Sequence, residues 1–370
     1  MRKVKVIGIT AILALGSFYL VSSGIAKPMA PAIKVAVLVS DSGALSFAGP
    51  IQRAAARLAV SDLSDSGSSV RVNLSFFDTG DTAEERARAV ARFVSSDCDL
   101  VIAPIESESA SILIAQSTKL PMIAPMTLED DLGSDSSKPW LFRLSASPSQ
   151  ESFALGEFIT QSKPKNVLIV TGPAPVNKAQ QKSLTFGLAM QGVRVTSMNI
   201  KDTKAISKIK PDSLVLLSME ESIPFLAAMS DWVEQIPQVF LVPSNSGDYS
   251  VYPWAKSLSG ALAISPRTAI SPSFRADFTK TLGYSTLSGA RGSLVLNLGQ
   301  RVYEAIRLAA SAYAQPKSDT AEGLRANLAS SMKDGKPLFD RNGFSKQIEY
   351  SVYRYGASGT FSLKSSFSPN

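Results

Sequence analysis

The sequence contains no histidine and only one cysteine, Cys98. Without histidine there is no Ser-His or Cys-His nucleophile and no HExxH zinc site, which excludes many hydrolytic and metal-dependent centres. Because an internal disulfide needs two cysteines, the fold must be stabilised by an ordinary hydrophobic core, which a chain of 370 residues can build. We interpret Cys98, beside the apolar run LVIAP, as a small buried side chain.

Signatures of nucleotide and nucleic-acid binding are also missing. No GxGxxG and no GxxxxGK[ST] occurs, and no block of Lys and Arg interleaved with aromatic residues accompanies the net charge of +7. SxxK spacing occurs at Ser162–Lys165 and Ser330–Lys333, but neither pair follows a strand, so both indicate chance. The sequence therefore predicts a protein that is not an enzyme, has no catalytic residues, cofactor or metal site, and has no nucleic-acid partner.

The first 26 residues have the pattern of a signal peptide. MRKVK is basic, VIGITAILALGSFYLV is apolar, and SSGIA ends in small residues that suit cleavage after Ala26. This predicts export to the periplasm or the extracellular space, with a mature net charge of +4, because Arg2, Lys3 and Lys5 are lost without any acid. An uncleaved membrane anchor is the alternative, although the apolar run is shorter than the roughly 20 residues of a span. A lipid anchor is not expected, because no cysteine lies near Ala26.

Apolar strands and helical segments alternate through the first half of the remaining chain. Strands are expected at 33–39, 70–77, 99–104 and 120–127, and helical segments follow the first three. Thr82 and Glu85 form the pattern of a capping box at the start of the second helix. Strands that are apolar throughout indicate a parallel sheet covered by helices on both faces.

The pattern pauses at 127–150, a segment rich in Asp, Ser and Pro, and then begins again. Further strands are expected at 165–172, 193–200, 212–218, 238–245 and 259–265. A short helical hairpin at 271–284, a long helix at 292–314 and a final β-hairpin at 348–365 complete the chain. The sequence thus predicts an α/β fold with two Rossmann-like lobes, each built on a parallel sheet.

Ligands of such sheets bind where the strands end. The polar loops SDSGALSFAG, IESESAS and MTLEDD follow the first, third and fourth strands. Ser107 and Ser109 either cap the helix that follows or donate hydrogen bonds to a ligand, and Ser107 is the better ligand candidate. Glu106 and Glu108 either complement a cationic ligand or stabilise the first turn of that helix.

Several segments together resemble a known family, the type I periplasmic binding proteins, specifically the leucine/isoleucine/valine-binding group that serves ABC transporters. The segments are IKVAVLVSDSGALSFAG, DLVIAPIESES, PMIAPMT, WLFRLSASPSQESFALGEFI and FDRNGFSKQIEYSVYRY. The resemblance implies two lobes joined by three crossovers, with residues 33–143 and 264–335 in lobe 1 and residues 144–263 and 336–364 in lobe 2. It also implies a solute trapped between the lobes and hinges near Leu144 and Ala263.

The resemblance further implies a set of ligand-binding residues. On lobe 1 and then lobe 2, the matching positions hold Ser42, Phe47, Ser107, Met126, Thr127, Leu128, Val176, Glu221, Ser244 and Asn245. Ser244 stands where the family has an acid that binds an ammonium group, and a buried ammonium without a carboxylate is costly. The expected solute is therefore an amino acid or a neutral amide-like molecule, a polyol or a short peptide, unless none is bound.

Two functions follow from this resemblance. The first is an exported solute-binding protein of an ABC-type transporter, which binds a small polar solute and presents it to a membrane permease. The alternative is an interaction module of the cell envelope without transport activity, similar to regulators of penicillin-binding synthases. The two functions differ in that the first requires binding of a small solute, whereas the second does not.

Overall fold

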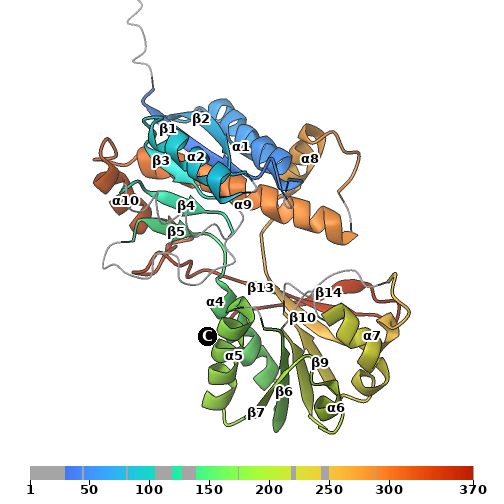
Figure 1. The fold of residues 1–370 in the computed structure, drawn as a ribbon. Helices are drawn as coiled ribbons and strands as arrows, with labels where there is room; N and C mark the ends of the chain where they lie inside the picture. The colour runs from blue at the N-terminus through green and yellow to red at the C-terminus, as the bar shows by residue number, and fades with distance from the viewer. Residues whose placement is uncertain are drawn as a thin grey trace, which may run out of the picture.

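The computed structural model describes residues 30–43, 46–80, 82–104, 119–126, 139–173, 175–217, 222–242, 250–287 and 289–369. It has two lobes joined by three segments of chain (Figure 1). The predicted signal peptide at 1–26 lies outside the described residues. None of the described helices combines the length and hydrophobicity that a membrane span requires.

Lobe 1 is built on a five-stranded parallel sheet in the order β2-β1-β3-β4-β5. The strands are β1 (Ala32–Val39), β2 (Arg71–Asp78), β3 (Leu100–Ile102), β4 (Met122–Ala124) and β5 (Leu141–Arg143). Strands β3, β4 and β5 are fully buried, which explains why β3 and β4 are apolar without alternation, whereas β5 ends in the buried Arg143.

The helices of lobe 1 come from both ends of the chain. They are α1 (Ala48–Asp65), α2 (Ala83–Val94), α8 (Pro272–Thr281), α9 (Gly289–Tyr313) and α10 (Ala321–Ala329), with a small ribbon of β11 (Met332–Lys333) and β12 (Lys336–Pro337) after them. The predicted capping box begins α2, where Thr82 Oγ1 accepts from Glu85 N at 3.2 Å and Thr82 N donates to Glu85 Oε2 at 3.0 Å.

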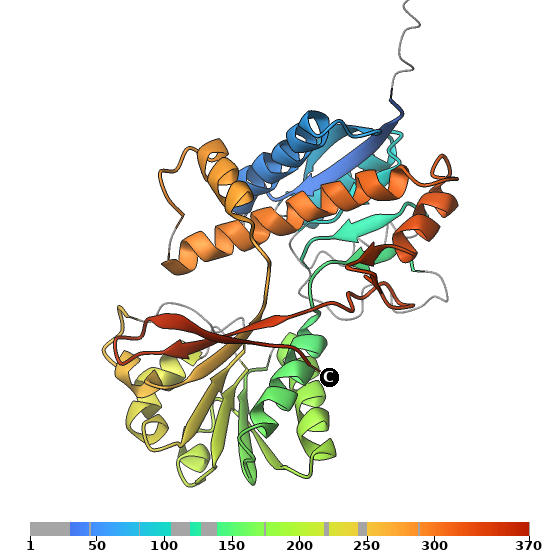
Figure 2. The same cartoon turned by 180° about the vertical axis from the view of Figure 1, so that it is seen from behind.

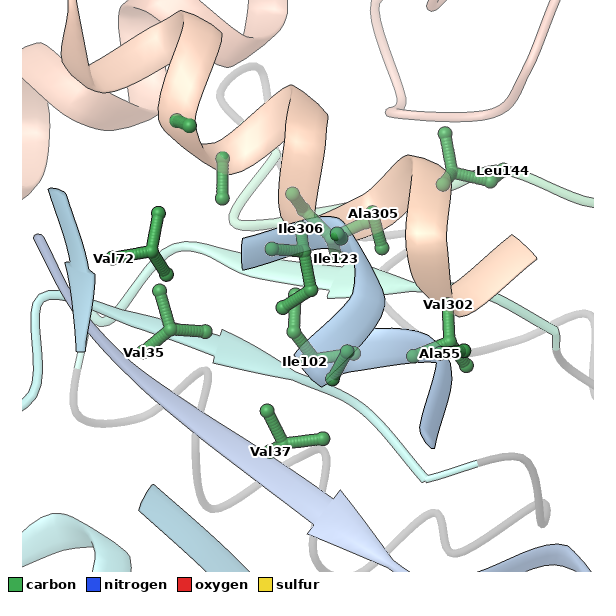
Figure 3. Packing of buried hydrophobic residues seen from close by; sticks show 14 of the residues in the cluster. Val35, Val37, Ala55, Val72, Ile102, Ile123, Leu144, Val302, Ala305 and Ile306 are labelled. Atoms are coloured by element: carbon green, nitrogen blue, oxygen red, sulfur yellow. The ribbon is translucent and has the colours of Figure 1, made fainter. Parts of the chain in front are cut away.

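One large core joins α1 and α9 to one face of the sheet (Figure 3). Val35, Val37 and Ile102 point from the strands toward Ala55 of α1 and Ile306 of α9. The opposite face carries a smaller core around Phe93 of α2. Helix α9 follows lobe 2 in the sequence, so lobe 1 is assembled from two distant stretches of chain.

Lobe 2 has a seven-stranded sheet in the order β14-β13-β10-β9-β8-β6-β7. Strands β6 (Asn166–Thr171), β7 (Arg194–Asn199), β8 (Ser213–Leu216), β9 (Gln238–Leu241) and β10 (Leu262–Pro266) are parallel. The hairpin of β13 (Tyr350–Tyr355) and β14 (Phe361–Phe367) adds an antiparallel edge, as the sequence predicts.

The helices of lobe 2 cover both faces of this sheet, with one core on each face. They are α4 (Pro148–Thr160), α5 (Pro175–Met190), α6 (Thr203–Ile206), α7 (Ser222–Val233) and the 3-10 helix η2 (Ala255–Leu258). Ser147 and Gln150 form a capping box at the start of α4 that the sequence analysis did not identify. This cap fixes the helix with which lobe 2 begins.

The three crossovers lie close together (Figure 2). The first runs from Arg143 to Pro148, and Arg143 N donates to Gly343 O at 2.8 Å, near the third. The second leaves β10, and Arg267 N donates to Glu349 O of the third crossover at 2.6 Å. These hydrogen bonds join the crossovers into one narrow connection between the lobes.

The expected division of the chain differs from the structure in two places. Strand β10 pairs with β9 and β13 up to Pro266, so the second crossover begins after the expected boundary between residues 263 and 264. Phe339 packs in the core of lobe 1 and on Phe142, with ring centroids 5.1 Å apart, so lobe 1 extends past residue 335. Both shifts follow from packing between residues that are distant in sequence.

Candidate functional site

The carboxyl ends of both sheets lie on the sides where the lobes are joined. Strand β5 ends at the first crossover and β10 ends at the second, and the other parallel strands of each sheet end at the same edge. Ligands of doubly wound sheets bind at these edges. We refer to them together as the facing edges: the residues that follow β1 to β5 in lobe 1 and β6 to β10 in lobe 2.

The turn after β1 is closely packed. Ser40 N donates to Oε1 of the buried Gln52 at 2.9 Å, and Gln52 Nε2 donates to Leu38 O at 3.2 Å. Gly49 N donates to Ser40 O at 2.9 Å, and a Cβ at Gly49 would lie 2.1 Å from Asp41 Oδ1 and 2.7 Å from Ser40 O. Only glycine fits this approach, so the start of α1 is held directly against the end of β1.

A carboxylate at the end of β2 organises the loop that contains the predicted residue Ser42. Asp78 accepts from Ser42 Oγ at 2.8 Å, from Asp41 N at 2.9 Å and from Gly80 N at 3.2 Å. Burial raises the pKa of Asp78, but these hydrogen bonds outweigh it and hold that pKa below its ordinary value. Asp78 is therefore ionised, and the Ser42 hydroxyl donates its proton within the protein.

A second charged pair lies beside this network. Arg53 of α1 forms an ion pair with Asp41, in which Arg53 Nε lies 3.0 Å from Asp41 Oδ2. The guanidinium of Arg53 also lies over the ring of Phe76, 4.7 Å from its centroid. The ends of β1 and β2 thus form one charged network in which most groups already have protein partners.

Two apolar residues of the predicted set are also placed by the structure. Phe47, which immediately precedes α1, is 46% exposed. Met126 follows β4, is half-buried and packs against the core of lobe 1. An exposed aromatic ring at a facing edge is available to cover the apolar part of a ligand.

The other predicted residues are placed only in part or not at all. Val176 lies in the first turn of α5, and nothing is described of its side chain. The remaining six lie outside the described residues: Ser107, Thr127, Leu128, Glu221, Ser244 and Asn245. Their role in ligand binding stays a prediction.

On lobe 2, the structure adds two amides that the sequence analysis missed. Asn177 and Gln180 lie in the first two turns of α5, directly after β6, and are only 7% and 5% exposed. No hydrogen bond links either side chain to another residue in the part of the chain that the structure describes. An amide held in a largely buried position, with no hydrogen bond to another described residue, can still donate to and accept from a ligand, so both are candidate ligand-binding residues.

The signal for these amides is present in the sequence. Asn177 and Gln180 share one face of α5 with Leu184 and Leu188, which are fully buried. Two polar residues at the start of an otherwise apolar helical stripe indicate polar groups turned toward the interior. The ungapped comparison with the family pointed instead to Val176.

A buried arginine lies at the end of β5. Arg143 is fully buried, and its guanidinium stacks 4.3 Å from the centroid of Phe344. In the sheet it lies next to Ala124 of β4. Arg143 therefore fastens the first crossover to the segment that leads into the third.

Among the described residues, no cluster of Cys, Asp and Glu has the arrangement of a metal site.

Comparisons with known proteins agree with this architecture. A family model described as "Periplasmic binding protein" matches residues 32–205. An ABC transporter substrate-binding protein from Desulfitobacterium hafniense, solved in complex with Leu, superimposes with a TM-score of 0.71 at 15% identity, over 90% of this chain and 100% of that one. No curated protein sequence matches the chain.

Two further solved structures have the same architecture. A leucine-binding protein, LivK, from Thermotoga maritima has a TM-score of 0.70 at 14% identity, over 91% of this chain and 99% of that one. A solute-binding protein from R. palustris in complex with benzoate has a TM-score of 0.64 at 14% identity, over 90% and 95%. The resemblance inferred from the sequence is thus confirmed, and this chain has the fold of the type I periplasmic binding proteins.

Proposed function

We propose that this protein is the exported solute-binding component of an ABC-type transporter and binds a small polar solute between its lobes. The observation that carries the proposal is the pair of largely buried amides at the facing edge of lobe 2, Asn177 and Gln180, which have no hydrogen bond to another residue that the structure describes. An amide both donates and accepts hydrogen bonds, so it suits a carboxylate, an amide or a hydroxyl group. The solute class we favour is an amino acid or an amide-like molecule.

The residues at the facing edges have distinct roles in this proposal. Asn177 and Gln180 bind the polar groups of the solute, and Phe47 covers its apolar part. Met126 and Ser42 complete the wall on lobe 1. The remaining predicted residues act as the family resemblance implies: Ser107, Thr127 and Leu128 on lobe 1, and Val176, Glu221, Ser244 and Asn245 on lobe 2.

The narrow connection between the lobes supports a hinge mechanism. Closure around a solute requires only a few residues to change their backbone angles, and the three adjacent crossovers offer such residues. In this proposal the closed form is presented to a membrane permease. Export by a signal peptide cleaved after Ala26 places the protein in the periplasm or the extracellular space.

The decisive experiment is a ligand screen on the mature protein. Native mass spectrometry of protein purified without denaturation would reveal a retained solute, and calorimetry would then measure its affinity. The panel contains α-amino acids, amides, ureas, polyols and aromatic carboxylates, because solved proteins of this fold are complexes with Leu and benzoate. Saturable binding that weakens about tenfold in Asn177→Leu supports the proposal. No binding across the panel contradicts it.

One observation favours a second candidate, an interaction module of the cell envelope. At the facing edge of lobe 1, the polar groups of Ser42, Asp41 and Asp78 already bind one another or Arg53. A surface satisfied in this way does not need a solute. Capture of a cell-wall synthase by the ligand-free protein, unchanged in Asn177→Leu, would support this candidate over transport.

A further inference from the structure

A single arginine of lobe 1 holds two of the three crossovers. Arg301 of α9 donates to Leu144 O in the first crossover, and its Nη2 donates to Arg267 O in the second at 3.4 Å. Burial lowers the pKa of Arg301, while Glu304 of α9 and Glu151 of α4 act in the opposite direction. Since a guanidinium stays protonated in proteins, a fixed positive charge lies at the junction of the lobes.

A cavity of about 590 Å³ opens beside this arginine, and we call it the hinge pocket. One wall is the stripe of α9 that carries Arg301, Glu304 and Arg307. The first crossover contributes Leu144, and the segment leading into the third contributes Lys333 and Gln347. Its size lies within the roughly 300–1,000 Å³ that is usual for small-molecule sites.

The charges of the hinge pocket favour an anion. Its lining contains three cations, Arg301, Arg307 and Lys333, and one acid, Glu304. Glu304 Oε1 accepts a hydrogen bond from Gln300 Nε2 at 3.2 Å, and Arg307 Nη1 donates to Tyr303 Oη at 2.9 Å. The guanidinium of Arg307 has further N–H groups for a ligand, because it carries five donors.

The lining also contains an apolar part beside the polar side chains of Ser68, Ser311, Ser345 and Gln347. Leu63, Leu144, Leu308 and Leu338 contribute hydrocarbon from α1, the first crossover, α9 and the segment after β12. A ligand that satisfies both parts has one carboxylate and a hydrocarbon body. A purely hydrophilic anion would leave the leucines exposed to water, and a neutral hydrocarbon would leave the cations without a partner.

We propose that the hinge pocket is a second binding site, separate from the facing edges, for a small amphipathic carboxylate. Arg307 and Lys333 bind the carboxylate, and the leucines bind the hydrocarbon. Arg301 forms the positive floor while it continues to hold the crossovers. This site does not depend on the solute proposed above, because none of its lining residues follows a parallel strand of either sheet apart from Leu144, which belongs to the first crossover.

The test is calorimetry of the full mature chain with octanoate as the probe, and with octanol and octylammonium as matched ligands. Octanoate should bind with a stoichiometry of one to one. Octanol and octylammonium should bind at least about tenfold more weakly, a loss equivalent to one or two charge-assisted hydrogen bonds. Equal affinity for octanol, or no binding of octanoate, would overturn the proposal.

Variants locate the site. The double variant Arg307→Gln and Lys333→Gln should lose about tenfold in octanoate affinity, and Ser311→Trp, which fills the pocket from α9, should abolish binding. Lys336→Gln is the matched control, because Lys336 is exposed on β12 but does not line the pocket. Thermal unfolding confirms that each variant is folded. Octanoate affinity that is unchanged in the filled or double variant, or lost in Asn177→Leu, would contradict a separate site.

Discussion

The two facing edges are built from different chemistry. Lobe 1 presents charges, with Asp41 paired to Arg53 and Asp78 held by three hydrogen bonds. Lobe 2 presents the neutral amides Asn177 and Gln180, which have no hydrogen bond to another described residue. The charges of lobe 1 mainly organise its own loop, whereas the amides of lobe 2 are left to bind something else. If the proposed function is right, the polar groups of a solute should therefore be bound chiefly by lobe 2.

The largest effect is expected from the closest packing in lobe 1. Gly49→Ala places a methyl group against Asp41 and Ser40 O, which should lower the free energy of unfolding by roughly 2–3 kcal/mol. Urea unfolding measures this change. Gly356→Ala is the control, because its nearest neighbours would lie at 3.8 Å, an ordinary contact distance. Equal losses in both variants would show that the turn after β1 is not rigid.

The amides of lobe 2 offer the next test. Asn177→Leu should weaken binding of the solute found in the ligand screen by about tenfold, since one or two hydrogen bonds are lost. Its stability should not fall, because the amide has no partner to lose among the described residues. Calorimetry and urea unfolding measure the two quantities.

The matched control for this change is Asn327→Leu. Asn327 Nδ2 donates to Ala312 O at 3.0 Å and Pro316 O at 3.1 Å, so its loss should cost roughly 1–3 kcal/mol of stability. Solute affinity should stay unchanged in this control. If Asn177→Leu lowers stability as much as Asn327→Leu does and leaves solute affinity unchanged, Asn177 is a structural residue and not a ligand-binding one.

A smaller effect is expected from the carboxylate of lobe 1, and it depends on pH. The pKa of Asp78 is lower in the folded protein than its ordinary value of 3.8, so its stabilisation is present above about pH 4 and is lost as pH falls through the folded pKa. Asp78→Asn should cost about 1 kcal/mol near neutral pH, since solvent screens this partly exposed group. Urea unfolding over a pH series should show the difference from wild type shrinking below about pH 4. A difference that grows in acid would rule out this account.

The smallest effect is expected from the hydroxyl that supports this carboxylate. Ser42→Ala removes one donor to Asp78, which should raise the pKa of Asp78 toward 3.8 and cost about 0.5 kcal/mol. An NMR titration of the Asp78 carboxyl carbon measures the shift. Solute affinity should fall less than in Asn177→Leu. If Ser42→Ala lost more affinity than Asn177→Leu, the polar groups of the solute would be bound chiefly by lobe 1.

The sequence predicted the alternation of strands and helices because the central strands are buried on both faces and read as uninterrupted apolar runs. It missed β5, a strand of three residues inside a segment rich in Asp, Ser and Pro, whose position depends on pairing with β4. It also missed α10 and predicted a helical hairpin where the structure has the single helix α8. These local patterns are weak, and contacts with distant residues determine the result.

The candidate site was predictable to a similar extent. The loops at strand ends follow from topology, so Ser42, Phe47 and Met126 were expected at the edge of lobe 1, where the structure has them. The partner of Ser42 was not predictable, because Asp78 lies 36 residues further along the chain. Asn177 and Gln180 were missed because the family resemblance pointed to Val176, although both lie on the same helical stripe as Leu184 and Leu188.

The placement of α9 has a consequence for how the chain folds. The large core of lobe 1 needs Val302, Ala305 and Ile306, which are synthesised after every parallel strand of lobe 2. Strands β6 to β10 lie in one continuous stretch of the chain, so each has a pairing partner that is close in sequence. Strand β1, in contrast, packs on a helix more than 250 residues further along the chain. Lobe 1 therefore cannot complete its core until α9 has been synthesised, and lobe 2 cannot complete its sheet until β13 and β14 follow, so an apolar surface stays uncovered in each lobe until late in synthesis.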